Sequence, residues 1–512
     1  MTLNASGPIS LGGSTVGQSI NLELGNSATA LASINSTPFR TLAGVPSGAI
    51  ALNNFYGKSN ASSWVLYLGQ GQPNLTVSAS IGTVCFGNYR WAAGRNSGVV
   101  AMGVNGRSAA NLTFGIKWIS SAGVASNNVF NGNAGGSGAD PAGLAPMYSA
   151  SSDVFYVAGN DQRYFNTVNA NGTTYNGGGS FNGLTSSDPP YINRGFGSCA
   201  CTDSSGNTVI VFHSDSKTFG SRILVGKFSS NTTYLSGLYS SYNNGFGYVN
   251  SIYPRSDGTF VAFGAGGTTA PDTGRAVFFN SAISAVTATY AINNYASTNQ
   301  FYTASAYDNV NNVSYMRGAV GGNVTIARFD SSFNCTAQVQ YYDTTDNFNM
   351  QGDGVSISYY GGYLYLVGTL AVAPSYFVVC QLNPTTLAVN WSYKFTIGNS
   401  KVFQQPGSSY QNVVATANGI YCFYYLASTN ECYLFNISGA SAPTPKTVNL
   451  PSAAGGTYSL TISAVTVTAT SLSNWTRTTP SASYGTVGAF GFGYGLTTST
   501  VTNGVSSTLV SF

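Results

Sequence analysis

Short apolar runs, separated by turn-forming residues, recur along most of this chain. From residue 98 onward one such run returns every 50 to 57 residues, each time rich in β-branched and aromatic side chains. Its seven copies are GVVAMG (98–103), VFYVAG (154–159), TVIVFH (208–213), TFVAFG (259–264), VSYMRG (313–318), YLYLVG (363–368) and IYCFYY (420–425). Runs of this length and composition, bounded by Gly, Asn, Asp and Ser, predict β-strands.

A second run follows the later copies of the first with the same period. Its anchors are spaced by 50 to 53 residues and are Phe228, Phe279, Phe329, Leu382 and Phe435. Turns such as DSSGN and RSDGT precede the first run and predict a hairpin to an earlier strand. Four strands per period with Gly- and Asn-rich turns are typical of β-propeller blades. A β-helix needs shorter rungs, and immunoglobulin-like sandwiches need about 100 residues per unit.

The period also indicates how the ring closes. Seven blades fit between residues 82 and 453, residues 62–80 are typical of the second half of another blade, and residues 487–495 of a first half. Pairing of N- and C-terminal strands would remove free sheet edges, which promote aggregation. We therefore expect an all-β propeller of seven to eight four-stranded blades, with residues 62–80 and the C-terminal part of 454–512 forming a closing eighth blade. Seven blades with an additional C-terminal β segment is the alternative.

The first 60 residues show helix start and stop signals instead of paired strands. Segments 15–25, 36–44 and 46–57 each end in a glycine that can take a left-handed stop, and the last two contain a capping Ser or Thr. Helices of two turns are not stable alone, and a unit of this size buries little apolar surface. We therefore divide the chain into an N-terminal module, residues 1–61, and a propeller, residues 62–512. The module is expected to pack on copies of itself, on the propeller or on a partner protein.

Several residue strings in this module are similar to a known N-terminal segment. They are Gly7-Pro8-Ile9-Ser10, Glu23-Leu24-Gly25, Arg40, Leu42-Ala43-Gly44, Ser47-Gly48-Ala49-Ile50 and Phe55-Tyr56-Gly57-Lys58-Ser59. Together they resemble the N-terminal segment of tailed-bacteriophage virion proteins, which are described as tail-fibre, baseplate-associated or tail structural proteins. The resemblance covers about 60 of 512 residues. It departs from the family pattern at Asn54, where an aspartate is common and could form a salt bridge.

The resemblance implies that residues 1–61 attach the protein to other phage tail proteins. The attachment segment would contain Leu42, Gly44, Ile50, Phe55, Tyr56 and Gly57. The protein would then be located in the virion tail, be assembled in the host bacterial cytoplasm, and be present in multiple copies per virion.

Composition narrows the classes of partner. Only 7% of the residues are charged, and the net charge of +4 arises from 19 basic and 15 acidic residues without a basic cluster. A nucleic-acid partner is therefore not expected. No apolar window is long enough for a membrane span, and the N-terminus lacks the pattern of a secretory signal. Most of the seven cysteines lie in apolar strand-like runs, which predicts buried free thiols.

The residues that could support catalysis are few. The single histidine, His213, occupies a repeat position that is usually Gly, and there are only two glutamates, Glu23 and Glu431. The aspartates Asp153, Asp203, Asp257 and Asp308 occupy the same strand-to-strand turn of different blades, where Asp is favoured because it bonds the local backbone. Arginines also fall in successive blades, at Arg222, Arg255, Arg275, Arg317 and Arg328. We expect no catalytic residue, no metal site and no cofactor, and predict that the protein is not an enzyme.

Tyrosine- and asparagine-rich segments offer surface for binding. They are residues 175–183, 239–248, 293–302 and 404–412, and their candidate contact residues are Tyr175, Tyr239, Tyr242, Tyr302 and Tyr410. Such side chains in rigid loops suit flat sugar or protein surfaces. The sequence therefore predicts a phage virion structural protein of the tail, a fibre, appendage or baseplate-associated component, which docks by its N-terminus and presents a propeller for assembly or host-surface adsorption. The alternative is a polysaccharide depolymerase or a glycan-binding receptor protein.

Overall fold

The computed structural model divides the chain into two compact units. One comprises Met1–Trp64 with Ile437–Pro445, and the other comprises Val65–Asn436 with Lys446–Phe512. The structure describes residues 3–24, 26–45, 47–58, 64–69, 92–94, 100–107, 112–119, 125–131, 145–149, 154–158, 164–169, 175–180, 199–216, 220–229, 234–241, 248–266, 273–294, 304–320, 323–343, 355–369, 376–397, 403–404, 413–416, 419–426, 431–437, 442–443, 445–451, 457–472, 475–479, 484–486, 498–499 and 507–511. The unit boundary after Trp64 lies close to the predicted one, whereas the inclusion of residues 437–445 in the N-terminal unit was not predicted.

The N-terminal module, described mainly over residues 3–58, contains three short helices. They are α1 (Ile20–Glu23), α2 (Thr37–Ala43) and the 3-10 helix η1 (Leu52–Phe55). Gly44 ends α2 in the left-handed conformation at φ 72°, as its position after the apolar run predicts. The predicted start at Ser47 is wrong, because η1 begins at Leu52 and Asn54 Oδ1 accepts a hydrogen bond from Ala51 N at 2.8 Å.

This module has a core of its own. The buried side chains are Leu3, Ile20, Phe39, Leu42, Ala43 and Phe55. Phe39 and Phe55 meet edge to face, with ring centroids 6.3 Å apart. The two ends of the module are joined by backbone bonds, from Leu3 N to Lys58 O at 2.8 Å and from Gly57 N to Asn4 O at 3.0 Å. The described residues therefore close on themselves as one unit.

The larger unit consists of antiparallel sheets, which we number as blades in chain order. Blade 1 contains β2 (Ala92–Gly94), β3 (Val100–Arg107), β4 (Leu112–Ile119) and β5 (Ala125–Asn131); blade 2 contains β6 (Ala145–Ser149), β7 (Val154–Ala158), β8 (Tyr164–Asn169) and β9 (Tyr175–Ser180); blade 3 contains β10 (Cys199–Thr202), β11 (Thr208–Ser216), β12 (Gly220–Phe228) and β13 (Tyr234–Ser241). Blade 4 contains β14 (Tyr248–Pro254), β15 (Phe260–Gly266), β16 (Thr273–Phe279) and β17 (Val286–Asn294); blade 5 contains β18 (Ala304–Asp308), β19 (Val313–Val320), β20 (Asn323–Phe329) and β21 (Cys335–Asp343); blade 6 contains β22 (Val355–Tyr360), β23 (Tyr363–Thr369), β24 (Tyr376–Leu382) and β25 (Val389–Ile397). Each blade is a four-stranded meander, so the predicted repeat is confirmed.

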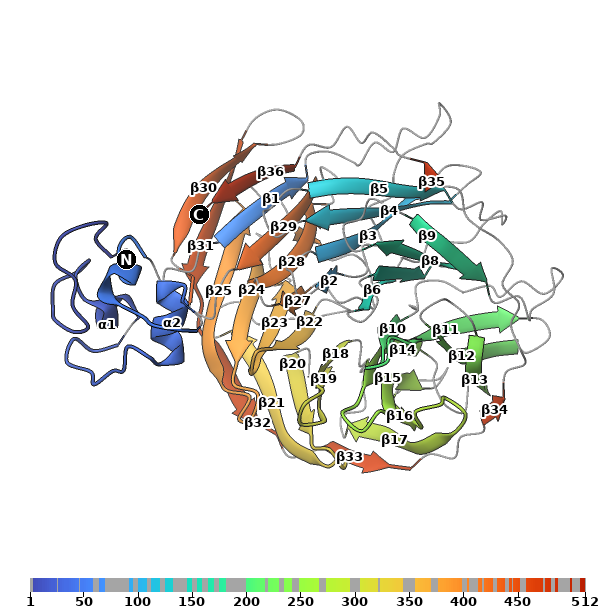
Figure 1. Cartoon of the computed structure of the whole chain (residues 1–512). Helices are drawn as coiled ribbons and strands as arrows, with labels where there is room; N and C mark the ends of the chain where they lie inside the picture. The colour runs from blue at the N-terminus through green and yellow to red at the C-terminus, as the bar shows by residue number, and fades with distance from the viewer. Residues whose placement is uncertain are drawn as a thin grey trace. The chain divides into compact units, whose positions relative to one another are not determined.

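Blade 7 joins the start of the propeller to its end. It contains β26 (Phe403–Gln404), β27 (Val413–Thr416), β28 (Gly419–Leu426) and β29 (Glu431–Ile437), followed in the sheet by β1 (Trp64–Gly69) and β36 (Ser507–Ser511). The first strands of neighbouring blades contact one another in the order β2, β6, β10, β14, β18, β22 and β27, and β27 contacts β2 again. The sheets therefore form a closed ring, a seven-bladed β-propeller (Figure 1).

The closing arrangement differs from the expected eighth blade. The N- and C-terminal strands do pair, with Val65 opposite Ser511 and Gly69 opposite Ser507. They extend blade 7, however, because β1 supplies the fourth strand that this repeat otherwise lacks. The described residues thus contain seven blades, and the rest of segments 62–80 and 487–495 lies outside them.

The C-terminal segment adds a further strand to the outer side of most blades. Going along the chain, β31 (Thr457–Ala464) pairs with β25, β32 (Val467–Ser471) with β21, β33 (Trp475–Thr478) with β17, β34 (Tyr484–Thr486) with β13, β35 (Thr498–Ser499) with β5, and β36 with β1; β30 (Lys446–Pro451) pairs with β31. We call β30 to β36 the C-terminal belt. It visits the blades in the reverse of their chain order and covers edges that would otherwise be free.

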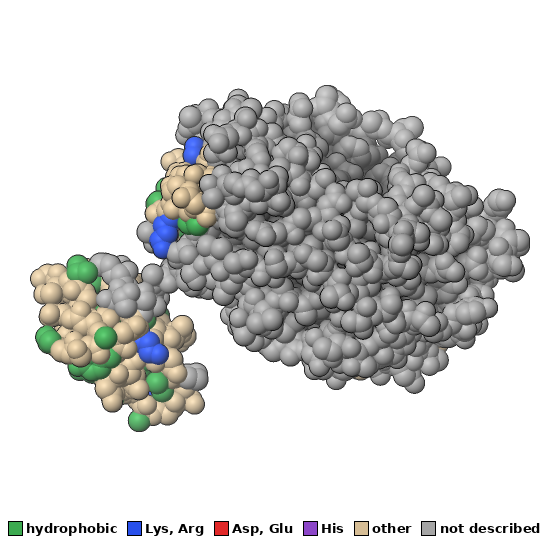
Figure 2. All heavy atoms as spheres, turned by 90° about the horizontal axis from the view of Figure 1, so that it is seen from above, with side chains coloured by type: hydrophobic (Ala, Val, Ile, Leu, Met, Phe, Trp, Pro, Cys, Tyr) green, Lys and Arg blue, Asp and Glu red, His purple; other side chains and the backbone are tan. Residues whose placement is uncertain are grey.

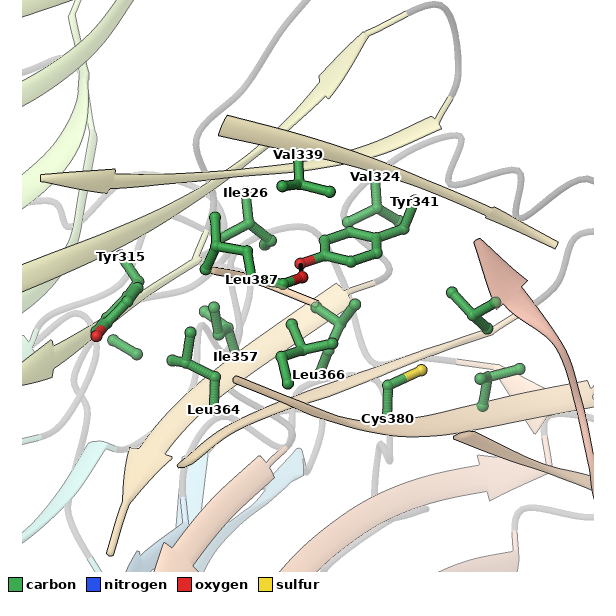
Figure 3. Packing of buried hydrophobic residues seen from close by; sticks show 14 of the residues in the cluster. Tyr315, Val324, Ile326, Val339, Tyr341, Ile357, Leu364, Leu366, Cys380 and Leu387 are labelled. Carbon is green, nitrogen blue, oxygen red and sulfur yellow. Dashed lines mark hydrogen bonds between the residues drawn. The ribbon is translucent and has the colours of Figure 1, made fainter. Parts of the chain in front are cut away.

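A recurrent turn fastens each of three blades to the one before it. Ile283, Phe333 and Leu387 occupy the same turn, between the third and fourth strands, with φ between 52° and 61°. This conformation is rare for branched and aromatic residues. Phe333 of blade 5 is buried against blade 4, with ring centroids 5.2 Å from Tyr290 and 5.5 Å from Phe278. Leu387 of blade 6 is buried in the core of blade 5, where its carbonyl accepts a hydrogen bond from Tyr341 at 2.6 Å (Figure 3).

Candidate functional site

Most of the predicted attachment residues shape the N-terminal module from inside. Leu42 and Phe55 are buried in its core, and Ile50 packs against that core. Gly57, like Gly44, has a left-handed backbone, with φ 68°. Only Tyr56 is exposed, and its hydroxyl donates to Gly7 O at 2.6 Å. The structure therefore brings these residues together, but as the framework of the module rather than as its surface.

Arg40 holds the loops on both sides of α2. Its guanidinium donates to Asn35 O at 3.2 Å and Asn35 Oδ1 at 3.0 Å, and also to Val45 O at 3.1 Å and Gly48 O at 3.0 Å. The planar fork of arginine can satisfy several acceptors at fixed positions, which lysine cannot do. The charge of Arg40 is thus used within the module.

The exposed surface of the module is apolar and uncharged over much of its described area. Leu31 is fully exposed (103%), Val16 is 61% exposed, and Leu52 is also exposed. Glu23 is buried. In the view of Figure 2 the described surface shows hydrophobic and basic side chains but no Asp or Glu. Exposed apolar side chains gathered on a small unit mark an interaction surface.

Sequence reasoning missed Leu31, Val16 and Leu52 as surface residues. Val16 and Leu31 lie in segments between the helices, outside the periodic pattern that identifies a core face. An apolar residue placed among Ser, Thr and Ala without a partner in the period was the signal that could have indicated exposure.

On the propeller, the aspartates named from sequence lie in hairpin turns between first and second strands. Asp203 Oδ1 accepts from Ser205 N at 2.9 Å and from Asn207 N at 2.8 Å. Asp257 Oδ1 accepts from Thr259 N, and Asp308 Oδ1 accepts from Val310 N, each at 3.0 Å. The prediction that these carboxylates serve their own turns is confirmed, and Asp153 lies outside the described residues.

The ionisation of these aspartates does not suit proton donation. Burial acts to raise the pKa of Asp203, but hydrogen bonds from Lys227 and Asn207 outweigh it and lower the pKa below its ordinary value. Asp257 and Asp308 likewise have lowered pKa values, because hydrogen bonds from Thr259 and Asn311 outweigh burial. A general acid at neutral pH needs a raised pKa instead.

These turns and the turns between third and fourth strands lie at the same end of each blade, which we call the turn face. Lys227 of blade 3 forms an ion pair with Asp203 at 2.9 Å and also donates to Ser281 O of blade 4 at 2.7 Å. Arg255 of blade 4 donates to Ser331 O of blade 5 at 3.3 Å. Tyr359 of blade 6 donates to Asp308 Oδ2 of blade 5 at 2.9 Å. The polar groups of this face therefore join neighbouring blades.

The arginine series does not form one cluster by its placement. Arg255 lies in a turn, whereas Arg222, Arg275, Arg317 and Arg328 lie on the strands β12, β16, β19 and β20. Arg317 is buried, and Arg328 donates to Thr336 Oγ1 on its own blade at 2.5 Å. His213 lies on β11 opposite Ile223. Among the described residues no three His, Cys, Asp or Glu side chains are grouped to hold a metal ion.

The predicted binding segments follow the fourth strand of their blades. Tyr175 and Tyr239 belong to the strands β9 and β13 rather than to loops, and Tyr242, Tyr302 and Tyr410 lie outside the described residues. Because consecutive strands are antiparallel, the fourth strand of one blade ends, and the first strand of the next begins, at the end opposite the turn face. The strand ends that flank all four segments therefore share one face, which we call the loop face.

The described thiols are consistent with the sequence prediction. Cys199, Cys380 and Cys422 are free and buried, while Cys201 and Cys335 are free and half-buried. Burial raises the pKa of all five thiols. Thiols with raised pKa values are poor nucleophiles. In the part of the chain that is described, no helix has the length and apolar character needed to cross a membrane.

Comparison with known proteins gives structural likeness only. No family model matches the chain, and no curated protein sequence matches it. Polysaccharide lyase Uly1 is similar at 10% identity and a TM-score of 0.42, covering 73% of this chain and 97% of that one. The Dos1 propeller has 9% identity and a TM-score of 0.39, covering 73% and 96%, and Sqt1 of Chaetomium thermophilum, bound to the N-terminus of ribosomal protein L10, has 12% and 0.35, covering 70% and 100%. At such values the likeness says nothing of function, and the propeller is established by the ring of sheets itself.

Proposed function

We propose that this chain is a structural protein of a phage tail, a fibre, appendage or baseplate-associated component, that docks through its N-terminal module and presents the propeller. The observation that carries the proposal is the module itself, a separate unit with its own core and an exposed, largely uncharged apolar surface. The resemblance of residues 7–59 to phage attachment segments supports the same role.

The proposed mechanism is non-covalent binding. Docking would bury Leu31, Val16 and Leu52 against other tail proteins, at about 25 cal/mol per Å² of apolar surface removed from water. Several copies per virion would add effective concentration to any weak contact that the propeller makes. The protein would act in the virion tail after assembly in the host cytoplasm, without catalysis, cofactor, nucleic acid or membrane insertion.

The test measures incorporation of variants into phage particles. Leu31→Asp places a charge in the proposed docking surface without touching the core of the module. Leu235→Asp is the matched control, because Leu235 is also exposed but lies on β13 of the propeller. In purified particles from phage whose own copy is replaced, we expect Leu31→Asp to reduce the incorporated chain at least about tenfold, as one buried charge costs more than 1.4 kcal/mol. Equal incorporation of both variants, or absence of the wild-type chain from particles, would contradict the proposal.

The second candidate is a glycan-binding receptor role at the loop face. It is favoured by the placement of four Tyr- and Asn-rich segments beside strand ends that share this face. Binding of the purified chain to host surface glycans on an array, with loss on Tyr239→Ala, would establish that role. Release of reducing ends from host polysaccharide would instead indicate a depolymerase, the enzyme alternative.

A further inference from the structure

The strand that closes the ring is held on both edges. In blade 7, β1 lies between β29 and β36. Its register with β36 runs through five pairs, from Val65 opposite Ser511 to Gly69 opposite Ser507. Without β36, β1 would be an edge strand that pairs on one side only. The last described residues of the chain therefore convert its first propeller strand from an edge into an interior strand.

The same strand is the covalent link between the N-terminal module and the ring. Only residues 59–63 separate Lys58, whose carbonyl closes the module, from Trp64, where β1 begins. Under the proposed function the module is fixed to the virion, so any pull on the propeller is carried along β1. A strand pulled along its axis must break the ladders on both edges before it leaves the sheet.

We propose that β36 is a clamp that retains β1 in the ring under load from the attachment end. The inference rests on the proposed function for the origin of the load, but the clamp itself is a property of the purified chain. Its strength comes from backbone hydrogen bonds between β36 and β1. The belt holds β36 in turn, because the strands before it pair with blade after blade, and Arg477 of β33 donates to Ser332 O of blade 5 at 2.7 Å.

Two neighbouring proline variants separate the hydrogen bonds from other effects. In an antiparallel pair, alternate residues exchange hydrogen bonds with the partner and the residues between them face away. Since β36 pairs with β1 alone, Leu509 and Val510 fall on opposite sides of this alternation. Proline removes a ladder bond at one position and is tolerated at the other. Leu509→Pro and Val510→Pro are thus each other's control.

The experiment pulls single full-length molecules between a handle at the N-terminus and a handle at a tag inserted between Gly361 and Gly362, an exposed turn of blade 6. At constant force, one proline variant should release β1 about tenfold faster than wild type, in line with loss of a ladder hydrogen bond, and the other should match wild type. Amide exchange in β1 should quicken at alternate residues in the same variant. Unchanged release and exchange in both variants, or equal changes in both, would overturn the clamp. Neither measurement needs a virion, so failure of the docking proposal would leave the result intact.

Discussion

The N-terminal module and the propeller reach stability by opposite means. In the module each important contact occurs once: one aromatic pair, one arginine that donates to both flanking loops, and one pair of backbone bonds between the ends. In the propeller the same turn, the same inserted residue and the same outer pairing recur from blade to blade. The difference teaches that a single substitution should be decisive in the module and local in the ring.

The largest effect is expected from Phe55→Ala. Phe55 is fully buried and packs on Phe39, and such a truncation costs about 3–5 kcal/mol. A unit this small has little reserve, so the module should unfold while the propeller keeps its melting transition. Limited proteolysis followed by mass spectrometry measures this, with cleavage confined to the first 64 residues. Loss of both units together would show that the contrast between them is wrong.

Arg40→Lys should have the next largest effect. The positive charge remains, but lysine cannot reach the carbonyls of Asn35, Val45 and Gly48 together, so the module should lose about 2 kcal/mol. Amide exchange within residues 35–48 reports the loss. Val16→Ala, at an exposed position of the same module, is the control and should change little. Comparable exchange in the two variants would remove Arg40 from the framework.

A smaller effect is expected from Phe333→Gly in the ring. Glycine relieves the strain at φ 61°, worth about 1 kcal/mol, but removes a ring stacked on Phe329 at 4.5 Å, worth about 3 kcal/mol. The net loss of about 2 kcal/mol should lower the melting temperature of the propeller without changing its fold. If the variant were as stable as wild type, insertion of this residue into blade 4 would not fasten the blades.

The smallest effect should appear in the acid limb of stability. The lowered pKa of Asp203 means that its ionised form is stabilised in the fold, so its contribution is fully present above its ordinary value of 3.8 and is lost as pH falls through the lowered value. Asp203→Asn should therefore lower the melting temperature at pH 7 and lessen its decline below pH 4. Melting curves from pH 7 to pH 2 measure this. Parallel curves for wild type and variant would contradict it.

Much of the ring was predictable because the repeat is written in buried anchors. Phe228, Phe279, Phe329 and Leu382, identified by spacing alone, are almost completely buried. The turn role of Asp203, Asp257 and Asp308 followed from local backbone chemistry, which depends on few neighbours.

Other features depend on long-range pairing that carries no local signal. The belt strands are short, as β34 and β35 show, and their partners lie hundreds of residues away in reverse order. The closing strands were expected to form a blade of their own, because the pattern shows that β1 is a strand but not which edge it meets. Leu31 and Val16 were missed for a related reason: exposure depends on the surrounding fold and not on the residue type.

The reverse order of the belt has a consequence for synthesis on the ribosome. Blades 1 to 6 are complete as four-stranded sheets long before their outer strands have been translated, and blade 7 receives its final strand only from residues 507–511. A chain that ends early would retain several uncovered sheet edges, which favour aggregation over assembly. The belt thus allows the cell to exclude truncated products, because only a chain translated through its last strand presents a finished rim.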